Sequence, residues 1–278
     1  MSINIKTELI SEIYKSCKME NSVDQNIEIL TKKHYSNGIS KEQFKVNKKV
    51  NHQDIGLYTI FNSKHLLIDP NNQINMIHKL ANTLKCYIKQ YSTSNVLVVG
   101  LGNRHISADS LGAKVIRNII VTRHLPQIKT LNSVSAIVPG VLGITGIETF
   151  DIVKAVISKT NPTLVIAIDS LCASSYKNLG TSFQINNASL IPGGGVNNPR
   201  EKLCAETLNT SFISIGVPLV IFANTFADNP KKKLNNLVVT LKDIEEVSHI
   251  CAKIISYAIN MAIHDLTIEE VKEYLNKI

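Results

Sequence analysis

The chain has 278 residues, of which 44% are hydrophobic, enough to form the core of one large domain or two modest domains. Its net charge is +8, with lysines concentrated in the first fifty residues and at 231–233. These lysines lack interleaved aromatic residues and any nucleic-acid-binding motif, so we expect no direct binding of nucleic acid.

The five cysteines are widely spaced and never form a CxxC pair, which argues against both a disulfide scaffold and a zinc site. No uncharged apolar run reaches the roughly 18 residues that a membrane span needs, and the N-terminus lacks the pattern of a signal peptide. These features predict a soluble protein of a reducing, cytoplasmic compartment.

The first predicted element is a short helix near the N-terminus. In the stretch KTELISE, residues 6–12, Thr7 is a suitable N-cap, and Ile10 and Ile13 begin an apolar stripe. The remainder of residues 1–72 is polar, although GLYTIF (56–61) and HLLIDP (65–70) have the length and composition of strands.

From residue 73 onward, helical and strand patterns alternate along the chain. Apolar residues at helical spacing predict helices over residues 73–90, 109–121, 148–160 and 243–264. Apolar runs predict strands over residues 95–103, 135–140, 162–171 and 211–224. This alternation predicts an α/β fold, a three-layer sandwich with a mostly parallel central sheet.

Two acids follow predicted strands at the sheet edge where ligands of α/β proteins collect. Asp109 opens the helix after GLGN, where helix capping is the ordinary alternative. Asp169 closes a buried strand, where a carboxylate must be desolvated, paired or used. Two such acids could share a proton, one acting as a base toward water and the other as an acid. Gly100 and Gly102 resemble the start of a dinucleotide fingerprint, but position 105 is histidine, so no cofactor is expected.

Other residues near these loops are weaker candidates. His124 ends a predicted helix, where a histidine also serves as an ordinary cap. The glycine-rich turns PGVLGITGIET (139–149) and PGGGV (192–196) are either tight loops or places where a peptide backbone can come close, because glycine has no side chain.

Several of these blocks occur in the same order in one known family. The blocks are GLGN, DSLG (109–112), VTRH, VSAIVPGVLGITGIET, VIAIDSL, PGGGV and SIGVP (214–218). Over roughly residues 95–225 they resemble the germination protease of spore-forming bacteria, which degrades small acid-soluble, DNA-protecting spore proteins when a spore germinates.

The resemblance implies an atypical aspartic endopeptidase, made as an inactive zymogen and working as a homotetramer in the developing spore and the spore core. Its fold is expected to be similar to that of the nickel-hydrogenase maturation proteases. The family's essential aspartates fall on Asp109 and Asp169 of this chain. We expect no cofactor, bound metal ion or membrane association. Substrate-binding or supporting roles are expected for His124, Glu148, Gly193 and Gly194.

One departure from the family bears on specificity. Arginine is common a few residues past the second aspartate, where this chain has Ala173, Ser174 and Ser175, so a charge that orients a carboxylate or an acidic substrate is missing. Two alternatives stay open. One is a metal-dependent maturation-type protease, in which the acids and His124 grip a metal carried by the substrate, and the other is a catalytically silent binding homologue.

The resemblance also gives the N-terminal stretch a second interpretation. The family cuts its substrates within a segment resembling Thr-Glu-(Ile/Phe)-Ala-Ser-Glu, after the first glutamate, and its zymogens are processed at a related sequence near their own N-terminus. The matching stretch TELISE (7–12) predicts self-cleavage between Glu8 and Leu9 at an exposed, poorly ordered terminus, with basic residues receiving the two acids. Residues 1–8 would then be a propeptide and residues 9–278 a single peptidase domain, with a variable part at 9–72 and a core at 73–278.

Overall fold

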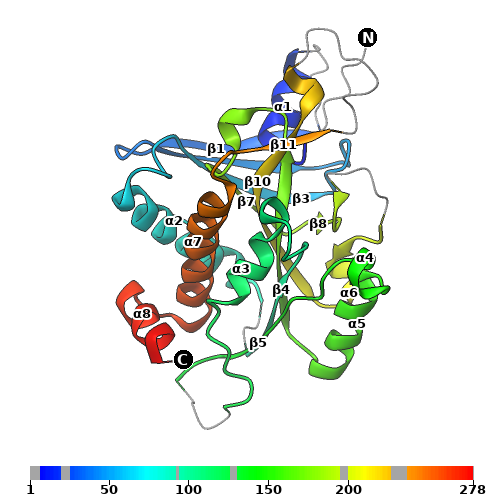
Figure 1. Cartoon of the computed structure of the whole chain (residues 1–278), viewed down its shortest axis with the longest axis vertical. Helices are drawn as coiled ribbons and strands as arrows, with labels where there is room; N and C mark the ends of the chain where they lie inside the picture. The colour runs from blue at the N-terminus through cyan, green and yellow to red at the C-terminus, as the bar shows by residue number, and fades with distance from the viewer. Residues whose placement is uncertain are drawn as a thin grey trace.

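The computed structural model describes residues 7–19, 26–91, 94–125, 130–194, 200–226 and 237–277. Within these ranges, nine strands form one mixed sheet in the order β1-β2-β3-β7-β10-β6-β4-β5, with β11 paired to β10 (Figure 1). The strands are β1 Ile27–His34, β2 Ile39–Val46, β3 Gly56–Ser63, β4 Asn95–Gly100, β5 Ser133–Ile137, β6 Leu164–Ala173, β7 Ser182–Asn186, β10 Ser211–Phe222 and β11 Val238–Thr240, and a separate pair is formed by β8 Ser189–Leu190 and β9 Leu203–Cys204.

The long central strands pair in parallel, and the outer strands add antiparallel edges. β10, β6, β4 and β5 are parallel neighbours, whereas β1, β2, β3 and β7 form an antiparallel extension beyond β10. β4 and β6 consist almost entirely of buried apolar residues, as expected for strands covered on both faces.

Helices cover both faces of the sheet and complete a three-layer α/β sandwich. One face packs against α2 Pro70–Ile88, α3 Leu111–Ile116, α7 Ile244–His264 and α8 Ile268–Lys277. The other face packs against α1 Ile10–Met19, α5 Thr149–Thr160 and α6 Ala205–Leu208, and α4 Leu142–Thr145 precedes α5. Of the helices in the described ranges, none combines the length and apolar character needed to cross a membrane.

The predicted sandwich is confirmed, but two predicted elements were wrong. HLLIDP is not a strand, because Asp69 accepts the Asn71 N–H at 2.9 Å as the N-cap of α2 and Pro70 occupies the first helical turn. The helix predicted over residues 109–121 is much shorter: a 3₁₀ turn spans Ser107–Asp109, and α3 ends at Ile116.

The second face of the sheet carries the polar residues that matter for function. Along β6, Val165 and Ala167 pack toward α5, whereas Leu171 and Ala173 pack toward α1. Asp169 lies between these two apolar groups on the same face, because side chains alternate along a strand. The middle of the sheet, including Asp169, therefore faces the space between α1 and α5.

Candidate active site

Asp169 sits in the middle of β6, flanked by two strands. Its register partner on β10 is Gly216, and on the other side the N–H of Leu101, just past the end of β4, donates to the carbonyl of Ile168 at 2.8 Å. Asp169 is 5% exposed. The loop that follows β4 thus leaves the sheet directly beside the buried carboxyl group of Asp169.

Asp109 reaches the same place from the loop after β4. Its Oδ2 accepts the N–H of Asn103 at 2.8 Å, so the loop folds back on the aspartate that follows it. Gly102 makes this possible: its φ is +93°, and a Cβ there would lie 2.1 Å from the Asp109 carbonyl oxygen. Gly112 brings α3 equally close, because its Cβ would lie 2.4 Å from the Leu101 nitrogen. The glycines of GLGN and DSLG therefore lock Asp109 against the end of β4.

The two carboxyl groups interact electrostatically. Burial raises the pKa of Asp169 well above its usual value, and the charges of Asp109 and Glu8 raise it further, against backbone N–H groups of Ser170 and Gly193 that lower it. Burial also raises the pKa of Asp109, but the Asn103 N–H and the Arg200 charge oppose that rise. The pair is thus asymmetric, with the proton held more tightly at Asp169.

Two of the predicted supporting residues lie near these acids. Gly193 donates its N–H to Asp169, and a Cβ on Gly194 would lie 3.2 Å from the Glu8 Oε1. The described part of the PGGGV turn thus passes close to Asp169 and Glu8. Residues 195 and 196 of that turn lie outside the described residues.

The N-terminal segment, residues 7–13, packs against the sheet beside β6 and β7. The Glu8 N–H donates to the Cys172 carbonyl at 2.9 Å, and the Cys172 N–H donates to the Glu8 carboxylate at 2.8 Å. Burial raises the pKa of Glu8 to about 7 despite that second bond. Leu9 and Ile10 are fully buried, in one apolar cluster with Phe44 of β2.

The second acid of the segment is held at the end of β6. The Glu12 carboxylate accepts N–H groups of Ser174 at 2.7 Å and Ser175 at 3.0 Å, the side-chain amide of Asn178 at 2.6 Å, and the Thr7 hydroxyl. Two of these donors are backbone N–H groups in the stretch 173–175, which has no basic residue. They hold an acidic residue without a basic side chain.

Three expectations about the N-terminal segment were wrong. Thr7 is not the N-cap of α1, which begins only at Ile10. The segment is not exposed, because Leu9, Ile10 and Ile13 pack into the core instead of facing solvent. Basic residues do not receive the two acids: within the described residues, the backbone N–H of Cys172 does so at Glu8, and backbone, amide and hydroxyl groups do so at Glu12.

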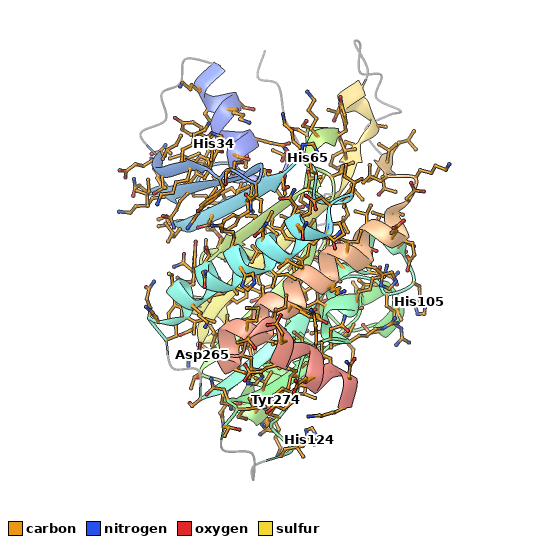
Figure 2. The ribbon with its side chains drawn as sticks, turned by 90° about the vertical axis from the view of Figure 1, so that its left-hand side faces the viewer. His34, His65, His105, His124, Asp265 and Tyr274 are labelled. Atoms are coloured by element: carbon orange, nitrogen blue, oxygen red, sulfur yellow. The ribbon has the colours of Figure 1, made fainter. Side chains whose placement is uncertain are left out.

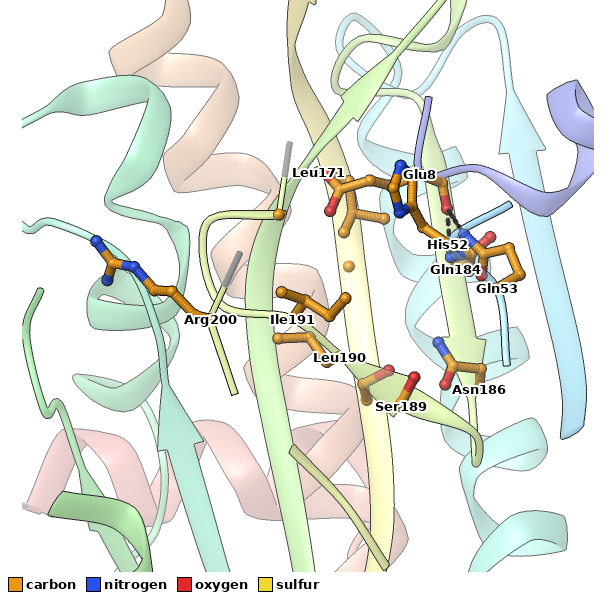
Figure 3. Close-up of a pocket in the computed structure, with 13 residues that line it drawn as sticks. Glu8, His52, Gln53, Leu171, Gln184, Asn186, Ser189, Leu190, Ile191 and Arg200 are labelled. Carbon is orange, nitrogen blue, oxygen red and sulfur yellow. Dashed lines mark hydrogen bonds between the residues drawn. The ribbon is translucent and has the colours of Figure 1, made fainter. Parts of the chain in front are cut away.

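Beside Glu8 lies a cavity of about 380 Å³ (Figure 3). Its floor comes from alternating positions of two neighbouring strands, Gln184 and Asn186 on β7 and Ser214 and Gly216 on β10. A second cavity, of about 200 Å³, lies between the GLGN loop and the turn before α4. The sequence motifs had not indicated the polar floor, although SFQIN in β7 alternates polar and apolar residues.

The structure does not bring His124 to this site. It is exposed and lies before β5, at the edge where the parallel strands begin (Figure 2). The aspartates lie toward the edge where these strands end. Glu148 lies at the N-terminus of α5, at the same edge of the sheet as the aspartates. Within the described residues, however, it lines neither cavity. Arg200, which sequence reasoning missed, is the residue whose charge acts on Asp109.

The described residues also bear on the metal-dependent alternative. Among the residues that the structure describes, no three histidine, cysteine, aspartate or glutamate side chains gather closely enough to hold a metal ion. The groups that do converge are carboxyls, backbone amides and side-chain amides.

The site places a buried carboxyl group, Asp169, and a half-buried one, Asp109, beside an N-terminal segment of the same chain, which defines an α/β protein equipped for acid–base chemistry. Comparison with known proteins agrees, since a family model described as germination protease matches residues 6–232. A germination protease of Caldanaerobacter subterraneus subsp. tengcongensis is 37% identical over 71% of this chain and 75% of its own length. For one of Clostridium tetani the identity is 36% with the same coverage, and for one of Bacillus cereus it is 43% over 51% of this chain and 41% of the relative. The chain belongs to the germination protease family.

Proposed function

We propose that the chain is an endopeptidase of the aspartic type, in which Asp109 and Asp169 together activate water. Family membership supports a peptidase acting in germination. The observation that carries the aspartic assignment is the proximity of two carboxyl groups with unequal, raised pKa values beside the end of β4.

The asymmetry of the pair suggests the role of each acid. Asp109, whose ionised form is favoured by Arg200, takes a proton from water as the water oxygen adds to the peptide carbonyl carbon. Asp169, whose proton is held by burial, gives it to the leaving nitrogen as the C–N bond breaks. The products are a new carboxyl group and a new amino group, and the proton taken up by Asp109 restores the pair.

We further propose that the chain is made as a zymogen and is its own first substrate, cut between Glu8 and Leu9. The docked segment supports this proposal, because Glu8 lies near enough to Asp169 to influence its pKa. Small acid-soluble spore proteins would be cut in the same groove, with their two acids held by the donors that hold Glu8 and Glu12.

The test is digestion of a small acid-soluble spore protein by the purified chain, with fragments mapped by mass. Cleavage after one glutamate of a repeated segment is expected, with none in Asp109→Asn or Asp169→Asn. Digestion that persists in both variants would refute the aspartic mechanism, and no digestion by the unaltered chain would refute the activity. Light scattering would test the proposed homotetramer, which rests on the family resemblance alone.

A further inference from the structure

We infer that the side-chain amides of Gln53 and Gln184 form the oxyanion-binding donors of this peptidase, holding the carbonyl oxygen of the residue before the cleaved bond. The inference rests on the proposed cleavage between Glu8 and Leu9. The two aspartates transfer protons, and the two glutamines would stabilise the negative charge on the carbonyl oxygen.

Both amides converge on one oxygen. The Nε2 of Gln53 and the Nε2 of Gln184 each lie 3.0 Å from the carbonyl oxygen of Glu8 (Figure 3). Two donors at this distance from a single carbonyl oxygen match the arrangement that stabilises the anion of a tetrahedral intermediate. The Glu8 carbonyl is the one that self-cleavage would attack.

Each glutamine is fixed by the backbone around it. Gln184 is 3% exposed and lies within β7, in register with Ile60 of β3 on one side and Gly216 of β10 on the other. Gln53 is 7% exposed and closes a tight turn, in which it exchanges backbone hydrogen bonds of 2.9 and 3.0 Å with Val50. Asn51 in that turn has a φ of 52°, which asparagine tolerates well. Donors held in this way need little rearrangement when charge develops.

Gln184 has a second contact that Gln53 lacks. Its Oε1 accepts the N–H of Ile10 at 2.9 Å, so one amide holds the carbonyl before the bond and the N–H of the second residue after it. Both contacts are to the backbone of the segment, so they do not depend on its side chains. Gln184 therefore contributes to binding as well as to the reaction, whereas Gln53 contributes to the carbonyl alone.

The role of the amides follows from where electrons move. When the water oxygen bonds to the carbonyl carbon, the C=O electron pair moves to the oxygen, which becomes an anion facing two N–H donors. When the intermediate collapses, that pair re-forms the C=O bond and the C–N bond breaks. Neither glutamine gains or loses a proton, so the proton transfers stay with the aspartates. Removing one such donor elsewhere lowers kcat by roughly 10²–10³-fold.

The experiment uses the full chain and a synthetic peptide of residues 3–16, with kcat and KM measured separately. The variants are Gln53→Met and Gln184→Met, which keep side-chain length but lose the donor. Gln43→Met is the matched control, because the Gln43 amide donates to Thr59 at 3.2 Å, outside the docked segment. A second peptide carries an N-methyl group at Ile10, which removes the N–H that Gln184 accepts.

The expected results separate the two glutamines. Gln53→Met lowers kcat by about 10²-fold with KM nearly unchanged, Gln184→Met lowers kcat and raises KM, and Gln43→Met changes neither. N-methylation raises KM for the unaltered chain and for Gln53→Met, but not for Gln184→Met. If Gln184→Met fails to fold, Gln53→Met decides.

Three outcomes overturn the inference in distinguishable ways. If the unaltered chain cuts the peptide and Gln53→Met keeps full kcat, the inference fails and the proposed function stands. If the unaltered chain cuts neither the peptide nor its own bond between Glu8 and Leu9, the proposed function fails and the inference fails with it. If it cuts only its own bond, the rate of self-cleavage in Gln53→Met decides, and a rate equal to that of the unaltered chain overturns the inference.

Discussion

The docking of the N-terminal segment should weaken as the pH rises, because Glu8 docks more favourably as a neutral acid. Its pKa is raised from 4.5 to about 7 by burial of the carboxyl group. Below pH 4.5 both docked and free segments are protonated and docking is strongest. Between pH 4.5 and 7 the free segment ionises while the docked one stays neutral, so docking is progressively lost, and above pH 7 it changes no further.

The size of the effect follows from the same two values. A difference of about 2.5 pKa units corresponds to roughly 300-fold in the docking equilibrium, or about 3 kcal/mol. The assay is hydrogen exchange at the Ile10 N–H, which Gln184 binds only in the docked state. Asp169→Asn is the background, so that the segment stays attached and the Asp169 titration is absent.

Protection of the Ile10 N–H, corrected for the intrinsic pH dependence of exchange, should fall by about two orders of magnitude between pH 4.5 and 7.5. Glu8→Gln should abolish this dependence, because the amide cannot ionise. Glu28→Gln, on the exposed side of β1, should leave it intact and serves as the control. Protection that does not vary with pH in the chain carrying Glu8 would refute the reasoning.

Three further predictions concern the carboxyl pair. Asp109→Asn and Asp169→Asn should each abolish peptide cleavage and the double variant should be no worse, because the two residues act as a unit; near-normal turnover in either single variant would refute the pairing. Gly102→Ala should lower kcat by about 10-fold or more, because its Cβ displaces Asp109, whereas Gly143→Ala, with nothing within 4 Å of its Cβ, should not; equal rates would contradict the packing argument. Arg200→Gln should raise the pKa of Asp109 and move the acidic limb of the kcat/KM profile to higher pH, and an unmoved limb would exclude Arg200 from this role.

The residues that the sequence predicted well are those whose patterns are local. The unbroken apolar run before Asp169 predicted a buried strand with a buried acid, and both are found, but Asp169 does not close the strand because β6 continues to Ala173. The sequence indicated only a cofactor-like pattern for Gly100 and Gly102, whereas the structure shows that these glycines allow the backbone to pass close to Asp109 and α3.

The residues that the sequence missed depend on contacts between distant parts of the chain. Gln53 lies in a turn and Gln184 in a five-residue strand, and nothing near either residue indicates that they meet at Glu8, 45 and 176 positions away. The charge of Arg200 likewise acts on Asp109 across a large separation in sequence.

The prediction that basic residues hold Glu8 and Glu12 was wrong for a different reason. The donors at Glu8 and Glu12 are mainly backbone N–H groups, which every residue except proline carries and which therefore leave no mark in the sequence. The prediction of an exposed N-terminal segment was wrong because Leu9 and Ile10, treated only as part of a cleavage motif, also complete an apolar cluster with β2 and β3.

The most direct test of the account is the intact mass and N-terminal sequence of the purified chain, incubated beside Asp169→Asn under identical conditions. The account predicts that the unaltered chain loses its first eight residues and begins Leu9-Ile10-Ser11, while Asp169→Asn stays full length. A chain that keeps its original N-terminus while cutting spore protein at full rate would contradict self-cleavage. Removal of the same eight residues in Asp169→Asn would contradict the assignment of the carboxyl pair.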